Sequence, residues 1–261
     1  MALPTVNTPK FDIKLPSTGK VIKIRPFLVK EQKVVLNAIE LRDTNMLNNA
    51  LDDVLKSCTF GAVDLDELPV YDIEFIIMQI RARSVGDVVE INYVCQNEVD
   101  DKVINQAAIN YDSKVEPMIG VGVCETKIPV KINLATLECR SDGVRPDNRI
   151  MFTSDIGIVM RDMPYGMYKE IGQQEPSVDN GLLAMASCID SVIDGEQIHN
   201  RGDFTDEELV TWLENLIGDE FDKLDAFMKS MPTMRVDMTL TCPKCGAKEQ
   251  IKLEGLDDFL A

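Results

Sequence analysis

Two cysteines near the C-terminus have the type and spacing of half a metal site. Cys242 and Cys245 enclose a Pro-Lys dipeptide, and Gly246 follows at once. A Cys-x-x-Cys turn that ends in glycine brings two thiolates to one side of a tight loop, where both can bind zinc. Zinc prefers four tetrahedral ligands, so this pair predicts a complete site only if two further ligands lie nearby.

An earlier segment repeats the approach to this turn and offers the missing ligands. Alternating apolar residues lead into Cys95 as they lead into Cys242, namely Val89, Ile91 and Tyr93 in the first case and Val236, Met238 and Leu240 in the second. Three residues after Cys95 stands Glu98 instead of a second cysteine. A mixed zinc site of Cys95, Glu98, Cys242 and Cys245 is chemically feasible, because zinc accepts carboxylate oxygen. The alternative is a knuckle without metal, held by ordinary hairpin packing.

The elements expected to position these cysteines occur in a similar order in both halves of the chain. Each half contains a β-hairpin, at 11–25 and 149–160, that is followed by helices. In the second half a strand at 127–132 precedes the hairpin. Apolar residues at helical spacing predict helices at 30–41, 47–58 and 73–80 in the first half. In the second half they predict a helix carrying Leu182, Met185, Ile189 and Val192, then helices at about 205–216 and 221–231. Thr205 and Glu208 form a capping box at the start of the second of these.

A second shared pattern ends these hairpins. Arg25-Pro26-Phe27 closes the first, and Arg161 to Tyr165 closes the second, with two residues inserted before the proline. Together the patterns predict an α+β fold of two pseudo-repeated lobes, residues 1–120 and 121–261. Each lobe would contain antiparallel β-hairpins plus two or three helices and end in a cysteine-tipped β-hairpin. The alternative is a chance order of elements, which any α+β domain can show.

Four residues at these corners are candidates for binding a partner protein. Arginine and aromatic side chains dominate many interfaces, which singles out Arg25, Phe27, Arg161 and Tyr165. The alternative is that the two aromatic rings fill the cores of their own lobes.

Composition excludes several classes of function. A net charge of −17 opposes binding to a nucleic-acid backbone, which requires clustered Lys and Arg. The single histidine and the absence of glycine-rich phosphate-binding motifs predict no catalytic residues, no small-molecule substrate and no enzyme. No apolar run reaches the roughly 18–20 residues of a membrane span, so no membrane insertion is expected. The N-terminus does not resemble a secretory signal, so we expect an intracellular protein with reduced thiols.

Three segments in this order resemble the baseplate protein family of T-even-type contractile-tailed bacteriophages, which comprises hub and hub-assembly proteins. They are Ile24-Arg25-Pro26-Phe27-Leu28 followed by Lys30-Glu31, Ile80-Arg81-Ala82-Arg83-Ser84-Val85-Gly86 before the Cys95 strand, and the closing Cys242-Pro-Lys-Cys245-Gly hairpin. The resemblance implies a non-enzymatic structural protein or assembly factor of the tail hub, made late in infection, whose partners are other baseplate hub proteins. It would act in the host cytoplasm during viral tail assembly or remain as a virion protein in the tail baseplate.

Two other functions compete with this interpretation. The cysteine knuckle also occurs in zinc-binding modules of transcription and nucleic-acid handling, although the negative charge opposes that function. A hydrolase is the third alternative. Glu98 departs from a paired-cysteine pattern, so an inherited metal site is not assured by the resemblance.

Overall fold

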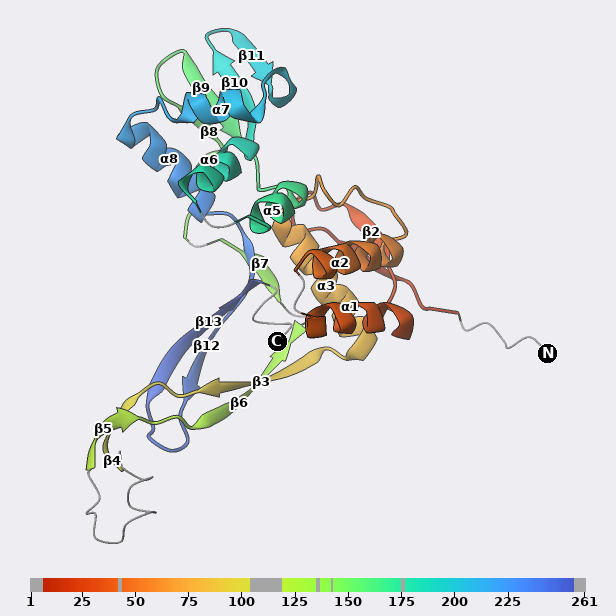
Figure 1. Cartoon of the computed structure of the whole chain (residues 1–261), viewed down its shortest axis with the longest axis vertical. Coiled ribbons are helices and arrows are strands. Elements are labelled where there is room, and N and C mark those ends of the chain that lie inside the picture. The colour runs from red at the N-terminus through yellow and green to blue at the C-terminus, as the bar shows by residue number, and fades with distance from the viewer. Residues whose placement is uncertain are drawn as a thin grey trace, which may run out of the picture. The chain divides into compact units, whose positions relative to one another are not determined.

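A computed structural model describes residues 7–41, 44–103, 119–134, 137–141, 143–174 and 177–255 of the chain. Its contacts divide the chain into two compact units, which we call unit 1 (Met1–Asp87 and Glu138–Met234) and unit 2 (Val88–Leu137 and Arg235–Ala261). Figure 1 shows the elements of both units. Helices occur together with antiparallel sheets, which confirms the predicted α+β class.

The first segment of unit 1 packs a hairpin against helices. Strands β1 (Phe11–Lys14) and β2 (Val21–Ile24) pair antiparallel. Helices α1 (Val29–Leu41), α2 (Thr44–Cys58) and α3 (Val70–Val85) follow. A first core combines apolar residues of the hairpin, of α2 and of α3 with Leu65 and Tyr165 from other parts of unit 1. Its buried members are Ile13, Leu15, Ile22, Ile24, Leu55, Cys58, Leu65, Ile73, Ile76, Ile80 and Tyr165.

The second segment of unit 1 begins with the short strand β7 (Glu138–Arg140) and contains a four-stranded antiparallel sheet of order β11-β10-β9-β8. Its strands are β8 (Arg149–Met151), β9 (Ile156–Met160), β10 (Ile189–Asp194) and β11 (Gln197–Asn200). The helices are α5 (Tyr165–Gly172), α6 (Val178–Ser187), the 3-10 turn η2 (Arg201–Asp203), α7 (Asp206–Leu213) and α8 (Gly218–Lys229). The predicted capping box opens α7, with Thr205 and Glu208 bonded reciprocally. A second core includes Ile158, Met160, Cys188, Leu224 and Phe227.

One predicted helix was wrong in its second part. Helix α6 ends at Ser187, and Ile189 and Val192 belong to strand β10. Apolar residues three or four apart suit either element, whereas the β-branched residues of β10 favour a strand. The Asp194-Gly195 pair is a hairpin signal, and Gly195 has a φ of 61°, which glycine adopts without strain.

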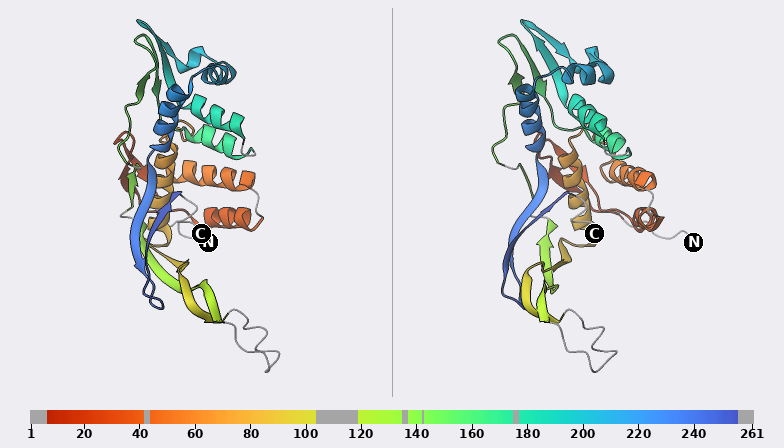
Figure 2. Two further views of the ribbon diagram at one scale, coloured as in Figure 1. Left: turned by 90° about the vertical axis from the view of Figure 1, so that its left-hand side faces the viewer. Right: turned by 60° about the vertical axis from the view of Figure 1, so that its left-hand side comes forward.

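Unit 2 consists of antiparallel strand pairs. Strand β3 (Val88–Val94) pairs with β6 (Lys127–Asn133), and β12 (Thr233–Thr241) pairs with β13 (Lys248–Glu254). Strands β4 (Glu98–Val103) and β5 (Ile119–Val123) form a third pair. Figure 2 shows that β4 and β5 extend the two-stranded ribbon that β3 and β6 form.

The lobes expected from the sequence differ from the contact units, because each unit combines segments from both halves of the chain. The boundary placed between residues 120 and 121 falls inside β5, and β6, expected to open the second lobe, pairs with β3. The division into two lobes of common origin stays a prediction.

Candidate metal centre

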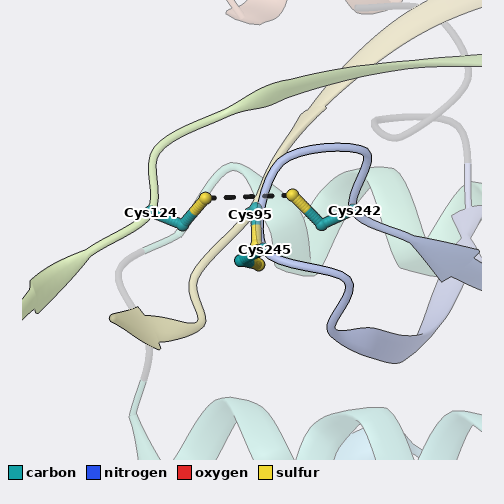
Figure 3. A group of neighbouring side chains, drawn as sticks. All are labelled: Cys95, Cys124, Cys242 and Cys245. Carbon is teal, nitrogen blue, oxygen red and sulfur yellow. Dashed lines mark hydrogen bonds between the residues drawn. The ribbon is translucent and has the colours of Figure 1, made fainter. Parts of the chain in front are cut away.

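Four cysteines of unit 2 meet where its two main hairpins turn. Cys95 directly follows β3, Cys124 follows β5, and Cys242 and Cys245 lie in the turn between β12 and β13. All four Sγ atoms lie within 4.8 Å of one another. Two Sγ–Sγ contacts join the hairpins, at 3.7 Å between Cys95 and Cys245 and at 3.8 Å between Cys124 and Cys242 (Figure 3).

These distances fit a tetrahedral ion. Zinc–sulfur bonds of about 2.3 Å place tetrahedral sulfur atoms about 3.8 Å apart. Cys95, Cys124 and Cys242 are buried and Cys245 is half-buried, with Val99 and Ile128 packed against the group. The group could therefore bind a metal ion, and four thiolates with no water position are the ligand set of structural zinc sites.

The surroundings of the thiols favour thiolate at two positions. The backbone N–H groups of Cys245 and Lys244 lower the pKa of Cys242 to about 6. A hydrogen bond from Thr126 lowers the pKa of Cys124. At Cys95 the N–H of Asn97 lowers the pKa, but burial and hydrogen bonds with the other three thiols outweigh it and raise the pKa to about 12. Negative charge on some of these sulfurs thus disfavours it on their neighbour, and a bound cation would offset this repulsion.

The sequence placed three of these four residues in a common site. Cys95, Cys242 and Cys245 come together, and Cys124 takes the place that we assigned to Glu98. Glu98 is exposed and lies in β4 opposite Val123. A signal for Cys124 was present, because Cys124-Glu-Thr-Lys precedes β6 as Cys245-Gly-Ala-Lys precedes β13.

One further polar contact joins the hairpins. The Tyr93 hydroxyl in β3 donates a hydrogen bond of 2.6 Å to Oε1 of Glu249 in β13. This bond to a carboxylate raises the pKa of Tyr93 to about 12, so the phenol stays a donor at neutral pH. The contact therefore helps to hold the two hairpins in the register that brings the four sulfurs together.

The candidate partner-binding residues of the first corner have intramolecular contacts in unit 1. The guanidinium of Arg25 forms an ion pair with Glu31, and both side chains are 11% exposed. Phe27 packs, partly buried, against the first core. Partner binding by these residues stays a prediction.

The second corner is more accessible at its arginine. Tyr165 is buried in the first core, whereas the Arg161 side chain is 35% exposed and lines two pockets, each of about 630 Å³. Its Nε donates to the Ser187 carbonyl. The two corners have equivalent backbone hydrogen bonds. The N–H of Arg25 donates to the Cys58 carbonyl, and the N–H of Arg161 donates to the Cys188 carbonyl.

The chain matches the model of a known protein family. A family model described as T4 bacteriophage base plate protein covers residues 7–261, nearly the whole chain. No significant match was found among curated proteins or among solved structures. In the part of the chain that the structure describes, no helix has the length and apolar character to span a membrane.

Proposed function

Because the chain belongs to the T4 bacteriophage base plate protein family, we propose that it is a structural or assembly protein of the tail baseplate hub. It acts by binding other baseplate hub proteins and catalyses no reaction. The observation that carries this proposal is the family match over residues 7–261, which leaves no large part of the chain for a separate catalytic domain. It is made late in infection and works in the host cytoplasm or in the finished tail.

The four-cysteine group contributes to this function by stabilising unit 2, and we propose that its ion is zinc. Around the four-cysteine group the buried cluster consists of three cysteine side chains, against which the partly buried Val99, Ile128 and Cys245 pack. Little apolar surface therefore joins the two hairpins at this point. Small elements with so thin a core commonly depend on a bound metal. In zinc-finger peptides the ion contributes roughly 10–16 kcal/mol of apparent binding energy to folding.

A phage that carries an affinity-tagged copy of the gene tests the hub assignment. We expect baseplate proteins to co-purify with the tagged protein from infected cells, either in assembly intermediates or in virions. A nonsense mutation should give lysates without complete baseplates by electron microscopy. Normal tails from the nonsense mutant would contradict the proposal, and retention on DNA or RNA at physiological salt would favour the zinc-module alternative.

Metal analysis of the purified protein tests the assignment of zinc. We expect one zinc per chain, retained through gel filtration and lost in the variant Cys242→Ser. The matched control is Cys188→Ser, because Cys188 is buried in the second core of unit 1 and is not a member of the four-cysteine group. A wild-type protein without stoichiometric zinc after expression in zinc-supplemented medium would contradict the assignment.

A further inference from the structure

We propose that the metal centre consists of two equivalent Cys-x-x-Cys knuckles, the first of which is interrupted between its cysteines by residues 96–123. Cys95 and Cys124 form the interrupted knuckle, and Cys242 and Cys245 form the continuous one. The inference deepens the zinc assignment and rests on it. It predicts that residues 96–123 are not needed to bind the ion.

Two backbone hydrogen bonds of the first turn have direct counterparts in the second. The N–H of Cys95 donates to the carbonyl of Thr126 at 3.0 Å, and the N–H of Cys242 donates to that of Ala247 at 2.8 Å. Each first cysteine also accepts a bond, from Glu125 to the Cys95 carbonyl at 3.0 Å and from Gly246 to the Cys242 carbonyl at 2.9 Å. The position two residues after the second cysteine therefore pairs with the first cysteine in both turns.

The residue after the second cysteine has the same unusual conformation in both turns. Gly246 has a φ of 74°, in the left-handed region that glycine adopts freely. Glu125 has a φ of 54°, although residues with a side chain rarely enter this region. A glutamate held in the conformation of the glycine indicates that the turn geometry, and not the local sequence, determines the backbone at Glu125.

The inserted segment closes on itself immediately beyond the cysteines. The N–H of Cys124 donates to the carbonyl of Asn97 at 2.9 Å, and Glu98 then faces Val123 as β4 pairs with β5. Its two ends therefore leave and re-enter the turn side by side. This arrangement explains how Cys95 and Cys124, although distant in sequence, place their sulfur atoms as Cys242 and Cys245 do in the continuous knuckle.

A shortened chain tests the inference directly. In this variant Pro-Lys, the dipeptide found between Cys242 and Cys245, replaces residues 96–123. We expect one zinc per chain, an affinity within about tenfold of the full chain in competition with a chromophoric chelator, and the same cobalt(II) absorption spectrum after metal exchange. Loss of zinc from the shortened chain alone, with its helical circular dichroism retained, would overturn the inference. Loss from the full chain as well would remove the zinc assignment itself.

Single substitutions in the full chain keep the test decisive if the shortened chain does not fold. Cys95→Ser, Cys124→Ser and Cys245→Ser should each weaken zinc binding at least roughly 100-fold, because removing a ligand should cost at least as much as removing its supporting contacts. The matched control is Glu98→Gln, which should leave the affinity unchanged. A Cys124→Ser protein that binds zinc normally, or a Glu98→Gln protein that does not, would overturn the inference.

Discussion

The ion pair between Arg25 and Glu31 allows a stability change to be worked out from the structure. Glu31 accepts hydrogen bonds from both terminal nitrogens of Arg25, at 2.7 and 3.0 Å, from the Leu28 N–H at 2.7 Å and from the Ser57 hydroxyl at 3.0 Å. These bonds, with that from Arg25 the strongest, lower the pKa of Glu31 from 4.5 to about 2. We therefore predict that Glu31→Gln strongly destabilises unit 1.

The magnitude follows from the size of this shift. Each pKa unit corresponds to about 1.4 kcal/mol, so the shift represents about 3 kcal/mol of folding free energy at neutral pH. Both side chains are only 11% exposed, so solvent screens the pair weakly. Breaking a fully buried pair by removing one partner typically costs about 3–5 kcal/mol, so this half-buried pair is expected at the lower end of that range.

The sign of the pH dependence is fixed as well. A carboxyl group whose pKa is lowered by folding stabilises the protein above its unfolded pKa, here near 4.5, and loses that contribution as the pH falls through its folded pKa of about 2. The difference in stability between wild type and Glu31→Gln should therefore be constant near neutral pH and shrink below about pH 4.5. Other titrating groups are common to both proteins and cancel in the difference.

Urea unfolding followed by circular dichroism from neutral to acidic pH measures this difference. Glu40→Gln is the control, because Glu40 is an exposed glutamate on the same helix α1. We expect a change below about 0.5 kcal/mol in the control, as for most surface substitutions. A loss below about 1 kcal/mol for Glu31→Gln at neutral pH, or a difference that persists undiminished at about pH 2, would refute the reasoning.

Three further predictions concern packing and metal retention. Phe227→Ala should cost about 3–5 kcal/mol in urea unfolding, because the ring is fully buried in the second core, and a loss below about 1 kcal/mol would contradict that packing. Gly157→Ala should destabilise the folded protein by about 1–3 kcal/mol in the same assay, since a Cβ would lie 2.6 Å from the Ile150 carbonyl oxygen. No change in stability would show that β8 can move aside. Acidification from about pH 8 to about pH 5 should release zinc, measured by a chromophoric chelator, because protons compete for the thiolates, and pH-independent retention would argue against thiolate ligands.

Much of the fold could be predicted because local signals agree with the tertiary structure. The alternation in Phe11, Ile13 and Leu15 and the helical spacing up to Cys58 correspond to β1 and α2, and the Thr205 capping box marks the start of α7. The signal failed around Ile189, where the spacing of apolar residues fits a helix or a strand, and the β-branched residues and the Asp194-Gly195 turn favour the strand.

The four-cysteine group could be predicted only in part, because a local spacing rule led from Cys95 to Glu98 and not to Cys124. Cys95 and Cys124 are neighbours only because β4 and β5 pair and return the chain to its starting point. Sequence separation hides such a contact, whereas the four-residue segments Cys124–Lys127 and Cys245–Lys248 reveal it once they are aligned. The place of Cys124 in the group thus depends on tertiary structure.

The distance along the chain between the two cysteine pairs has a consequence for the order of biosynthesis. Cys124 and Cys242 are 118 positions apart, and the intervening residues include all of the four-stranded sheet. A ribosome therefore exposes the first pair long before the second, and the proposed ion would not be fully enclosed until the last hairpin has emerged. A polypeptide released before Cys242 is made would keep the thiols of Cys95 and Cys124 without the second cysteine pair. This difference would distinguish incomplete chains from finished ones.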